Sequence, residues 1–142
     1  MAIANLLETL NSYVLRKNTL QCEIMENQAL KACAVAETAN NNSILSAGKA
    51  ELRARFKKLY KENPNEYPDI NSYEEIPEFK EQMDKLTAQI QAQLDEIAAW
   101  ETQLNNEQTQ MSTEMAEIDA YIDSFKQMLQ QNVTDDFNLS LS

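Results

Sequence analysis

A seven-residue repeat of apolar side chains in the second half of the sequence restricts the possible folds more than any other feature. Its members are Met83, Ile90, Ile97, Leu104, Met111, Ile118 and Phe125. Such a heptad repeat is typical of α-helices that pack side by side, whereas a β-strand would place the same residues on both of its faces. Trp100 occupies the complementary heptad position. The repeat therefore predicts one long amphipathic helix over about residues 77–131.

A second helix is predicted in the first half of the sequence. Its apolar heptad positions include Ile3, Leu10, Leu20, Ile24, Leu52 and Leu59. Lys17 and Lys31 also fall at core positions, where we expect each stem to follow the seam and each ammonium group to reach water or an acid. Residues 40–43 favour helix caps, so the helix of about residues 2–62 either continues through them or kinks there.

A turn over residues 63–76 separates the two predicted helices. Pro64 and Pro68 cannot continue a helix, and the pair Ser72 and Glu75 has the spacing of a capping box. Pro77 suits the first turn of the following helix. We therefore predict an all-α fold, a long antiparallel two-helix hairpin that resembles a coiled coil.

The distribution of charge supports this hairpin. Residues 1–62 carry nine Lys and Arg against six Asp and Glu, whereas residues 63–142 carry three against seventeen. Folding the chain back at the turn brings the basic run of residues 49–61 close to the acidic run of residues 74–84. We expect opposite charges to face each other there, although an exposed ion pair contributes only ~0–1 kcal/mol.

Composition argues against catalysis and against nucleic-acid binding. The chain has no His and a single Gly, so His-dependent triads, common zinc sites and glycine-rich phosphate loops cannot be built. Its net charge of −11 would repel the phosphate backbone of a nucleic acid. We expect no catalytic, cofactor-binding or metal-binding residues, and we interpret acidic residues such as Glu107 and Glu114 as solvated charge.

The sequence also gives expectations about the cellular compartment. No stretch approaches the ~20 apolar residues that a membrane-spanning helix requires, and no basic segment precedes the first apolar run. We expect no membrane insertion, and a protein that is cytoplasmic or exported without a conventional signal peptide. Cys22 and Cys33 are separated by ~16 Å along a helix, too far for an internal disulfide. They are interpreted as half-buried thiols, with disulfides between chains as the alternative.

Apolar residues beyond the two heptad seams suggest self-association. In the second helix these are Leu94, Met115, Ile122 and Leu129, and in the first they are Leu7, Val14, Leu15 and Met25. A hairpin that covers one stripe on each helix would leave them exposed, and a bundle of several copies would bury them. The leading hypothesis is therefore a structural or assembly protein that forms a homo-oligomer.

The last segment, residues 132–142, is an acidic tail in which the heptad pattern stops. It is interpreted either as a frayed end or as a docking segment in which Phe137, Leu139 and Leu141 contact a partner. The docking interpretation leads to a second hypothesis of a different class. In that case the chain is an adaptor, chaperone or secreted export substrate that binds another protein through the hairpin or the tail.

Overall fold

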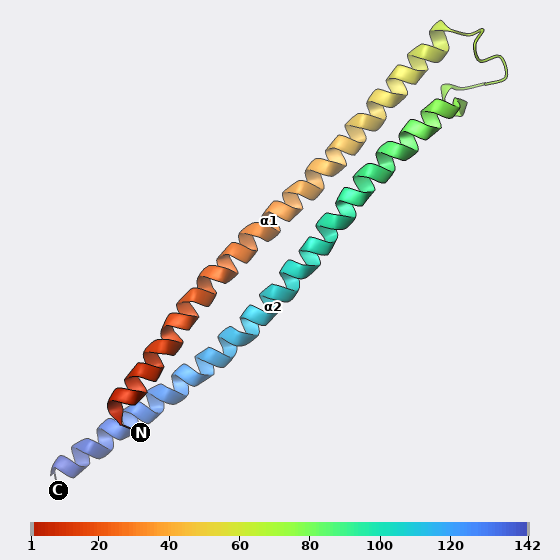
Figure 1. Ribbon diagram of the computed structural model, residues 1–142. Coiled ribbons are helices and arrows are strands. Elements are labelled where there is room, and N and C mark those ends of the chain that lie inside the picture. The colour runs from red at the N-terminus through yellow and green to blue at the C-terminus, as the bar shows by residue number, and fades with distance from the viewer. Residues whose placement is uncertain (1, 142) are drawn as a thin grey trace. The chain divides into compact units, whose positions relative to one another are not determined.

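The computed structural model describes residues 2–141 and shows an all-α hairpin, as predicted (Figure 1). Helix α1 spans Ile3–Glu62, the short 3-10 helix η1 spans Tyr73–Glu75, and helix α2 spans Pro77–Leu141. The two long helices pack against each other in antiparallel directions. No β-strand occurs between residues 2 and 141.

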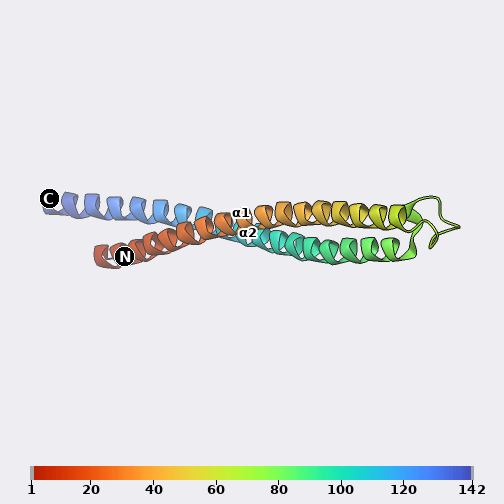
Figure 2. The ribbon, with the colours of Figure 1, turned by 90° about the horizontal axis from the view of Figure 1, so that it is seen from above.

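The chain forms two compact units, which are described separately. Unit 1 contains residues 1–31 and 103–142, and unit 2 contains residues 32–102. Each unit therefore pairs one part of α1 with one part of α2, and the turn belongs to unit 2 (Figures 1 and 2).

Helix α1 ends where the first proline of the turn requires it. Its last residue is Glu62, and the amide of Asn63 still donates to the carbonyl of Leu59 at 3.1 Å. Pro64 disfavours helical geometry in the residue before it and has no amide hydrogen to continue the bonding pattern. The expected end of the first helix near residue 62 agrees with this boundary.

The turn ends at the capping residues that the sequence indicates. Ser72 has extended backbone angles and its hydroxyl accepts a hydrogen bond from the Glu74 amide at 3.3 Å. The carboxylate of Glu75 accepts one from the Asn71 amide at 3.0 Å. These two bonds start η1, and α2 begins immediately afterwards with Pro77, whose missing amide hydrogen costs nothing in a first turn.

Residues 40–43 do not interrupt α1, and of the two alternatives the helix continues. Asn and Ser in a helix interior cost at most ~0.7 kcal/mol each, which tertiary packing easily offsets. The side chain of Asn41 donates to the Glu37 carbonyl at 2.9 Å, so its amide group is satisfied within the helix. Gly48 reflects packing in unit 2: a Cβ atom there would lie 2.8 Å from Cδ2 of Leu86.

Helix α2 extends to Leu141, ten residues beyond the expected end near residue 131, so this boundary is corrected. No Gly or Pro lies between residues 132 and 141, and extending an existing helix costs little per residue. Local bonds also support it, because the Gln131 side chain donates to Asp135 at 3.0 Å and Thr134 donates to the Gln130 carbonyl at 2.9 Å. The tail is therefore helical.

Candidate functional site

The seam of unit 1 is an apolar core flanked by polar residues. Leu20, Ile118 and Ile122 form its buried centre. The half-buried residues packed against them are Leu10, Tyr13, Met111 and Met115. The rings of Tyr13 and Tyr121 stack with centroids 5.3 Å apart.

Burial corrects the assignment of Leu94 in unit 2 and of Met115, Ile122 and Leu129 in unit 1 to a separate exposed oligomer face. Ile122 is buried in the hairpin's own core, Met115 packs against that core, and Leu94 and Leu129 are half-buried. Tyr121 and Met128, at the strict heptad positions, are the exposed ones. An α-helix drifts by about 20° per heptad relative to a straight seam, so the row one residue further round turns toward α1.

Polar residues join the helices across the seam of unit 1. Arg16 donates two hydrogen bonds to the carboxylate of Glu114, at 2.9 and 3.0 Å. This pairing holds the pKa of Glu114 below its ordinary value and raises that of Arg16, chiefly through the hydrogen bonds. Lys17 reaches Asp119 at 2.6 Å. Its ammonium group therefore ends on an acid, as expected for a lysine at a core position.

Lys31 and Asn27 extend this polar set. The ammonium group of Lys31 donates to the side-chain carbonyl of Gln108. Asn27 is only 3% exposed, and its Nδ2 donates to the backbone carbonyl of Leu104 at 3.0 Å. The Oδ1 atom of Asn27 is buried and accepts no hydrogen bond from the described residues. Sequence analysis missed Asn27, although the spacing of Leu6, Tyr13, Leu20 and Ala34 places residue 27 in the same heptad row.

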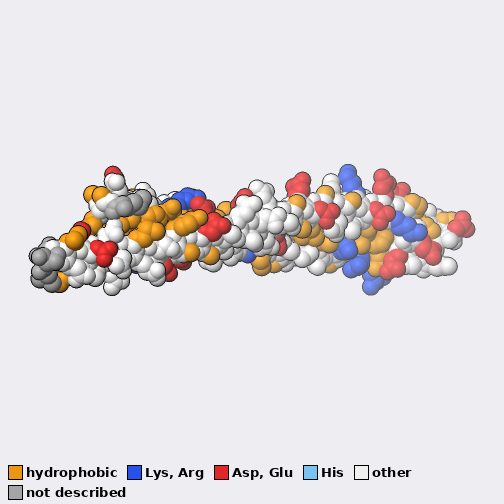
Figure 3. All heavy atoms as spheres, turned by 90° about the horizontal axis from the view of Figure 1, so that it is seen from below, with side chains coloured by type: hydrophobic (Ala, Val, Ile, Leu, Met, Phe, Trp, Pro, Cys, Tyr) orange, Lys and Arg blue, Asp and Glu red, His pale blue; other side chains and the backbone are white. Residues whose placement is uncertain are grey.

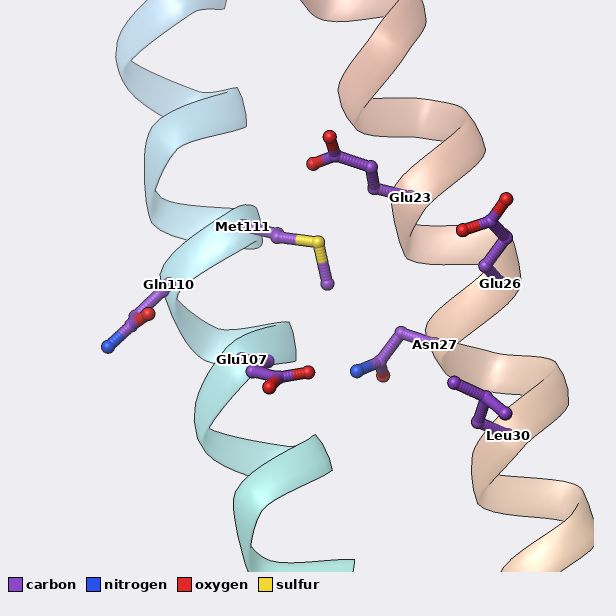
Figure 4. A pocket seen from close by; sticks show the side chains of 7 residues that line it. All are labelled: Glu23, Glu26, Asn27, Leu30, Glu107, Gln110 and Met111. Atoms are coloured by element: carbon purple, nitrogen blue, oxygen red, sulfur yellow. The ribbon is translucent and has the colours of Figure 1, made fainter.

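A pocket of about 310 Å³ opens beside Asn27 within unit 1. It is lined by Glu23, Glu26, Asn27, Leu30, Glu107, Gln110 and Met111. In Figure 4 the side chains of Asn27 and Glu107 extend toward each other from α1 and α2, and Met111 reaches into the same space. Gln110 points away from it.

The core of unit 2 lies at the turn and is rich in aromatic rings. Phe56, Ile76 and Phe79 are buried, and the Phe56 and Phe79 rings meet edge-on at 5.5 Å between centroids. The turn is tied to α1 because the Tyr60 hydroxyl donates to the Ile70 carbonyl at 2.8 Å. Sequence analysis did not identify Ile76, which lies inside the segment that was assigned to the turn.

Charge pairing at the turn differs from the expectation. Among the described residues of unit 2 the only ion pair is Lys58 with Glu62, at 4.0 Å and within α1. Arg55 instead donates to the side chain of Gln82 and lies over the Phe56 ring at 5.3 Å. An exposed ion pair contributes little free energy in water, so it does not offset the entropy lost when two long side chains are fixed across the helices.

Most of the predicted core residues lie in the seam. Leu20, Ile90, Ile97, Leu104 and Ile118 are buried. The half-buried ones are Ile3, Leu10, Ile24, Leu52, Met83, Trp100, Met111 and Phe125. Leu59 is exposed and is a correction, because from Leu52 onward the inward residues are spaced by four, through Phe56 to Tyr60.

An uncharged stripe covers the outer side of α1 in unit 1. At 100° per residue its members lie within about 100° of one another around the helix, facing away from the seam. They are Leu7, Asn11, Val14, Leu15, Asn18, Cys22, Met25 and Ala29, which we call the outer stripe. All eight are exposed, Leu15 at 67% and Met25 at 69%. Figure 3 shows one face of the molecule, on which hydrophobic side chains lie at the surface among charged ones.

The helical tail also exposes apolar side chains. Phe137 is 62% exposed, and Val133 and Leu139 are exposed as well. In Figures 1 and 2 this end of α2 continues past the start of α1. The side chain of Leu141, the third predicted docking residue, lies outside the described part of the structure.

Cys22 and Cys33 are free thiols and both are exposed, so the expectation that they are half-buried is wrong. Each lies on a surface of α1 that faces away from the seam of its own unit. Within residues 2–141, no three Asp, Glu or Cys side chains are grouped closely enough to hold a metal ion. Among the described residues, no helix contains an apolar stretch of the length that a membrane-spanning segment needs.

Comparison of this chain with protein-family models, with curated proteins and with solved structures finds no match.

Proposed function

We propose that this chain is a non-enzymatic structural or assembly protein that self-associates through its helices. The observation that carries the proposal is the exposed outer stripe of unit 1. This stripe exposes apolar side chains next to Asn11 and Asn18, and exposed apolar patches mark candidate sites of protein contact. The stripe includes Leu7, Val14, Leu15 and Met25, the four residues of α1 that the sequence predicted to lie beyond the hairpin seam.

A second copy of the chain is the partner that the charges favour. Each copy carries a net charge of −11, so two copies repel each other over most of their surface. The outer stripe carries no charged residue, although a quarter of the chain is charged, so contact there involves the least repulsion. Leu15, Cys22 and Ala29 also repeat every seven residues, the spacing that a further helix packing against α1 requires. A two-fold contact would bury the same stripe on both copies and form a bundle.

Sedimentation equilibrium of the full chain in reductant tests this proposal, because reductant prevents exposed cysteines from linking copies. We expect the wild-type chain to form dimers or larger assemblies, and the double variant Leu15→Glu, Met25→Glu to be monomeric. The matched control is Met128→Glu, Val133→Glu, which adds the same charge to exposed apolar positions of α2 and should still assemble. A monomeric wild-type chain at submillimolar concentration would overturn the proposal, and assembly of the stripe variant would reject this interface.

The exposed tail favours a second candidate function, that of an adaptor, chaperone or export substrate. Phe137 lies four residues after Val133, so both occupy one face of the α2 terminus and could enter a groove of another protein. The variant Phe137→Ser, Leu139→Ser distinguishes the two functions. If this variant no longer retains a stoichiometric second protein but still self-assembles, the adaptor function is supported. If the variant no longer self-assembles, the tail belongs to the contact between copies.

A further inference from the structure

The pocket beside Asn27 in unit 1 has an acidic lining, and packing of the two helices does not by itself explain it. Three carboxylates line it, from Glu23 and Glu26 of α1 and Glu107 of α2, and no Lys or Arg is among its lining residues. Two of these carboxylates already have neighbours. The Gln103 side chain donates to Glu107 at 3.1 Å, and a guanidinium nitrogen of Arg16 lies 3.8 Å from Glu23.

The charge of these carboxylates is only partly neutralised. Arg16 directs both of its short hydrogen bonds to Glu114, so its 3.8 Å approach to Glu23 is the weaker of its two pairings. Gln103 is uncharged and cannot neutralise Glu107. The pocket therefore carries an excess of negative charge on both of its walls, which favours a cationic ligand.

Asn27 adds an independent sign that a hydrogen-bond donor is missing. Its Oδ1 atom is buried and has no partner among the described residues, its Nδ2 atom is bonded to Leu104, and the residue lies in the lining of the pocket. Buried acceptors are nearly always paired, because they lose their bonds to water on burial. In Figure 4 this side chain extends from α1 into the space between the helices. A ligand in the pocket that offers an N–H or O–H group to Oδ1 of Asn27 would supply the missing donor.

The lining also has an apolar part, which favours a ligand whose charged groups are joined by apolar segments. Leu30 and Met111 line the pocket together with the acids. Glu23 and Glu26 lie three residues apart on α1 and Glu107 lies on α2, so the carboxylates are spread over two helices and suit an elongated ligand better than a single point charge. We propose that this pocket binds an aliphatic polyamine, with an ammonium group donating to Oδ1 of Asn27 and methylene groups against Leu30 and Met111.

Calorimetric titration of the full chain with spermidine at low ionic strength tests the proposal. We expect saturable binding that weakens about tenfold or more, equivalent to ~1.4 kcal/mol, in Glu107→Gln and in Asn27→Leu. Glu117→Gln is the charge-matched control, because it removes an exposed carboxylate from the same helix outside the pocket and should leave the affinity unchanged. Glu23→Gln provides a further variant if Asn27→Leu alters the fold, which circular dichroism would reveal.

Three outcomes would overturn the proposal. The first is the absence of saturable heat with spermidine. The second is equal weakening by Glu107→Gln and Glu117→Gln, which would show a diffuse counterion effect. The third is tighter binding of magnesium chloride or of a lysine-containing peptide than of spermidine. Because the outer stripe does not include the pocket, loss of spermidine binding leaves the proposal of self-association intact, and the reverse also holds.

Discussion

Arg16 and Glu114 stand 98 positions apart in the chain and are joined by two hydrogen bonds, of 2.9 and 3.0 Å. The guanidinium donates with Nε and Nη2 to the two oxygens of one carboxylate. This two-point geometry fixes the rotation of both side chains as well as their separation. The pair therefore marks one register between α1 and α2 within unit 1, which a point contact between apolar side chains would not do.

We expect this pair to make stability depend on acidity. The folded pKa of Glu114 lies below its ordinary value, so its contribution is fully present above the unfolded pKa and is lost as the pH falls through the folded one. Urea unfolding should show wild type more stable than Glu114→Gln near pH ~7, with the difference narrowing as the pH falls and closing below the folded pKa of Glu114. Glu117→Gln should show no such pH-dependent difference from wild type. A gap that is unchanged at acidic pH would mean that the difference in stability does not come from the ionised carboxylate of Glu114.

Leu20 should carry much more of the stability of unit 1 than Leu15, which lies on the same helix. Leu20 is 0% exposed between Ile118 and Ile122, whereas Leu15 is 67% exposed. Leu20→Ala should lower the free energy of unfolding by about 2–4 kcal/mol. Leu15→Ala should change it by less than about 0.5 kcal/mol when measured on the monomer. Urea denaturation followed by circular dichroism measures both, and equal losses would contradict the seam described for this unit.

The hydroxyl of Tyr60 should stabilise the turn. It donates to the Ile70 carbonyl at 2.8 Å, and Tyr60→Phe removes this bond while keeping the ring. We expect a loss of about 1 kcal/mol in unfolding free energy, together with faster hydrogen exchange of amides in residues 64–76. Tyr121→Phe is the control, because that ring is exposed and should change neither quantity. Unchanged exchange in Tyr60→Phe would show that the aromatic core holds the turn without this bond.

Local signals in the sequence predict the elements of this protein well. The heptad row from Met83 to Phe125 predicts a helix because only a period near 3.6 residues keeps those side chains on one face. Pro64 predicts where α1 ends, and Ser72, Glu75 and Pro77 predict that the second long helix begins between residues 72 and 77, because proline lacks an amide hydrogen and short polar side chains cap helix ends. These effects act over a few residues and do not depend on the rest of the fold.

The candidate sites were harder to predict, because they depend on which side of a helix faces its neighbour. Sequence reasoning assigned Ile122 to an outer face and Leu59 to the seam, whereas the structure buries Ile122 and exposes Leu59. Adjacent rows differ by 100° of rotation, and a drift of about 20° per heptad accumulates over several heptads until a neighbouring row faces the other helix. The four apolar residues of α1 that sequence analysis placed beyond the seam are exposed and lie in the outer stripe.

The sequence by itself determined that this chain makes two long helices joined by a proline-containing turn, because period, caps and breakers are properties of short segments. Only the tertiary structure decided which residues are buried in the seam and which acid Arg16 binds. It also decided that Oδ1 of Asn27 has no hydrogen-bond donor among the described residues. Those outcomes depend on the relative rotation and register of two helices that are distant in sequence. They are set by packing across the seam, where shifts of a fraction of a turn change every neighbour.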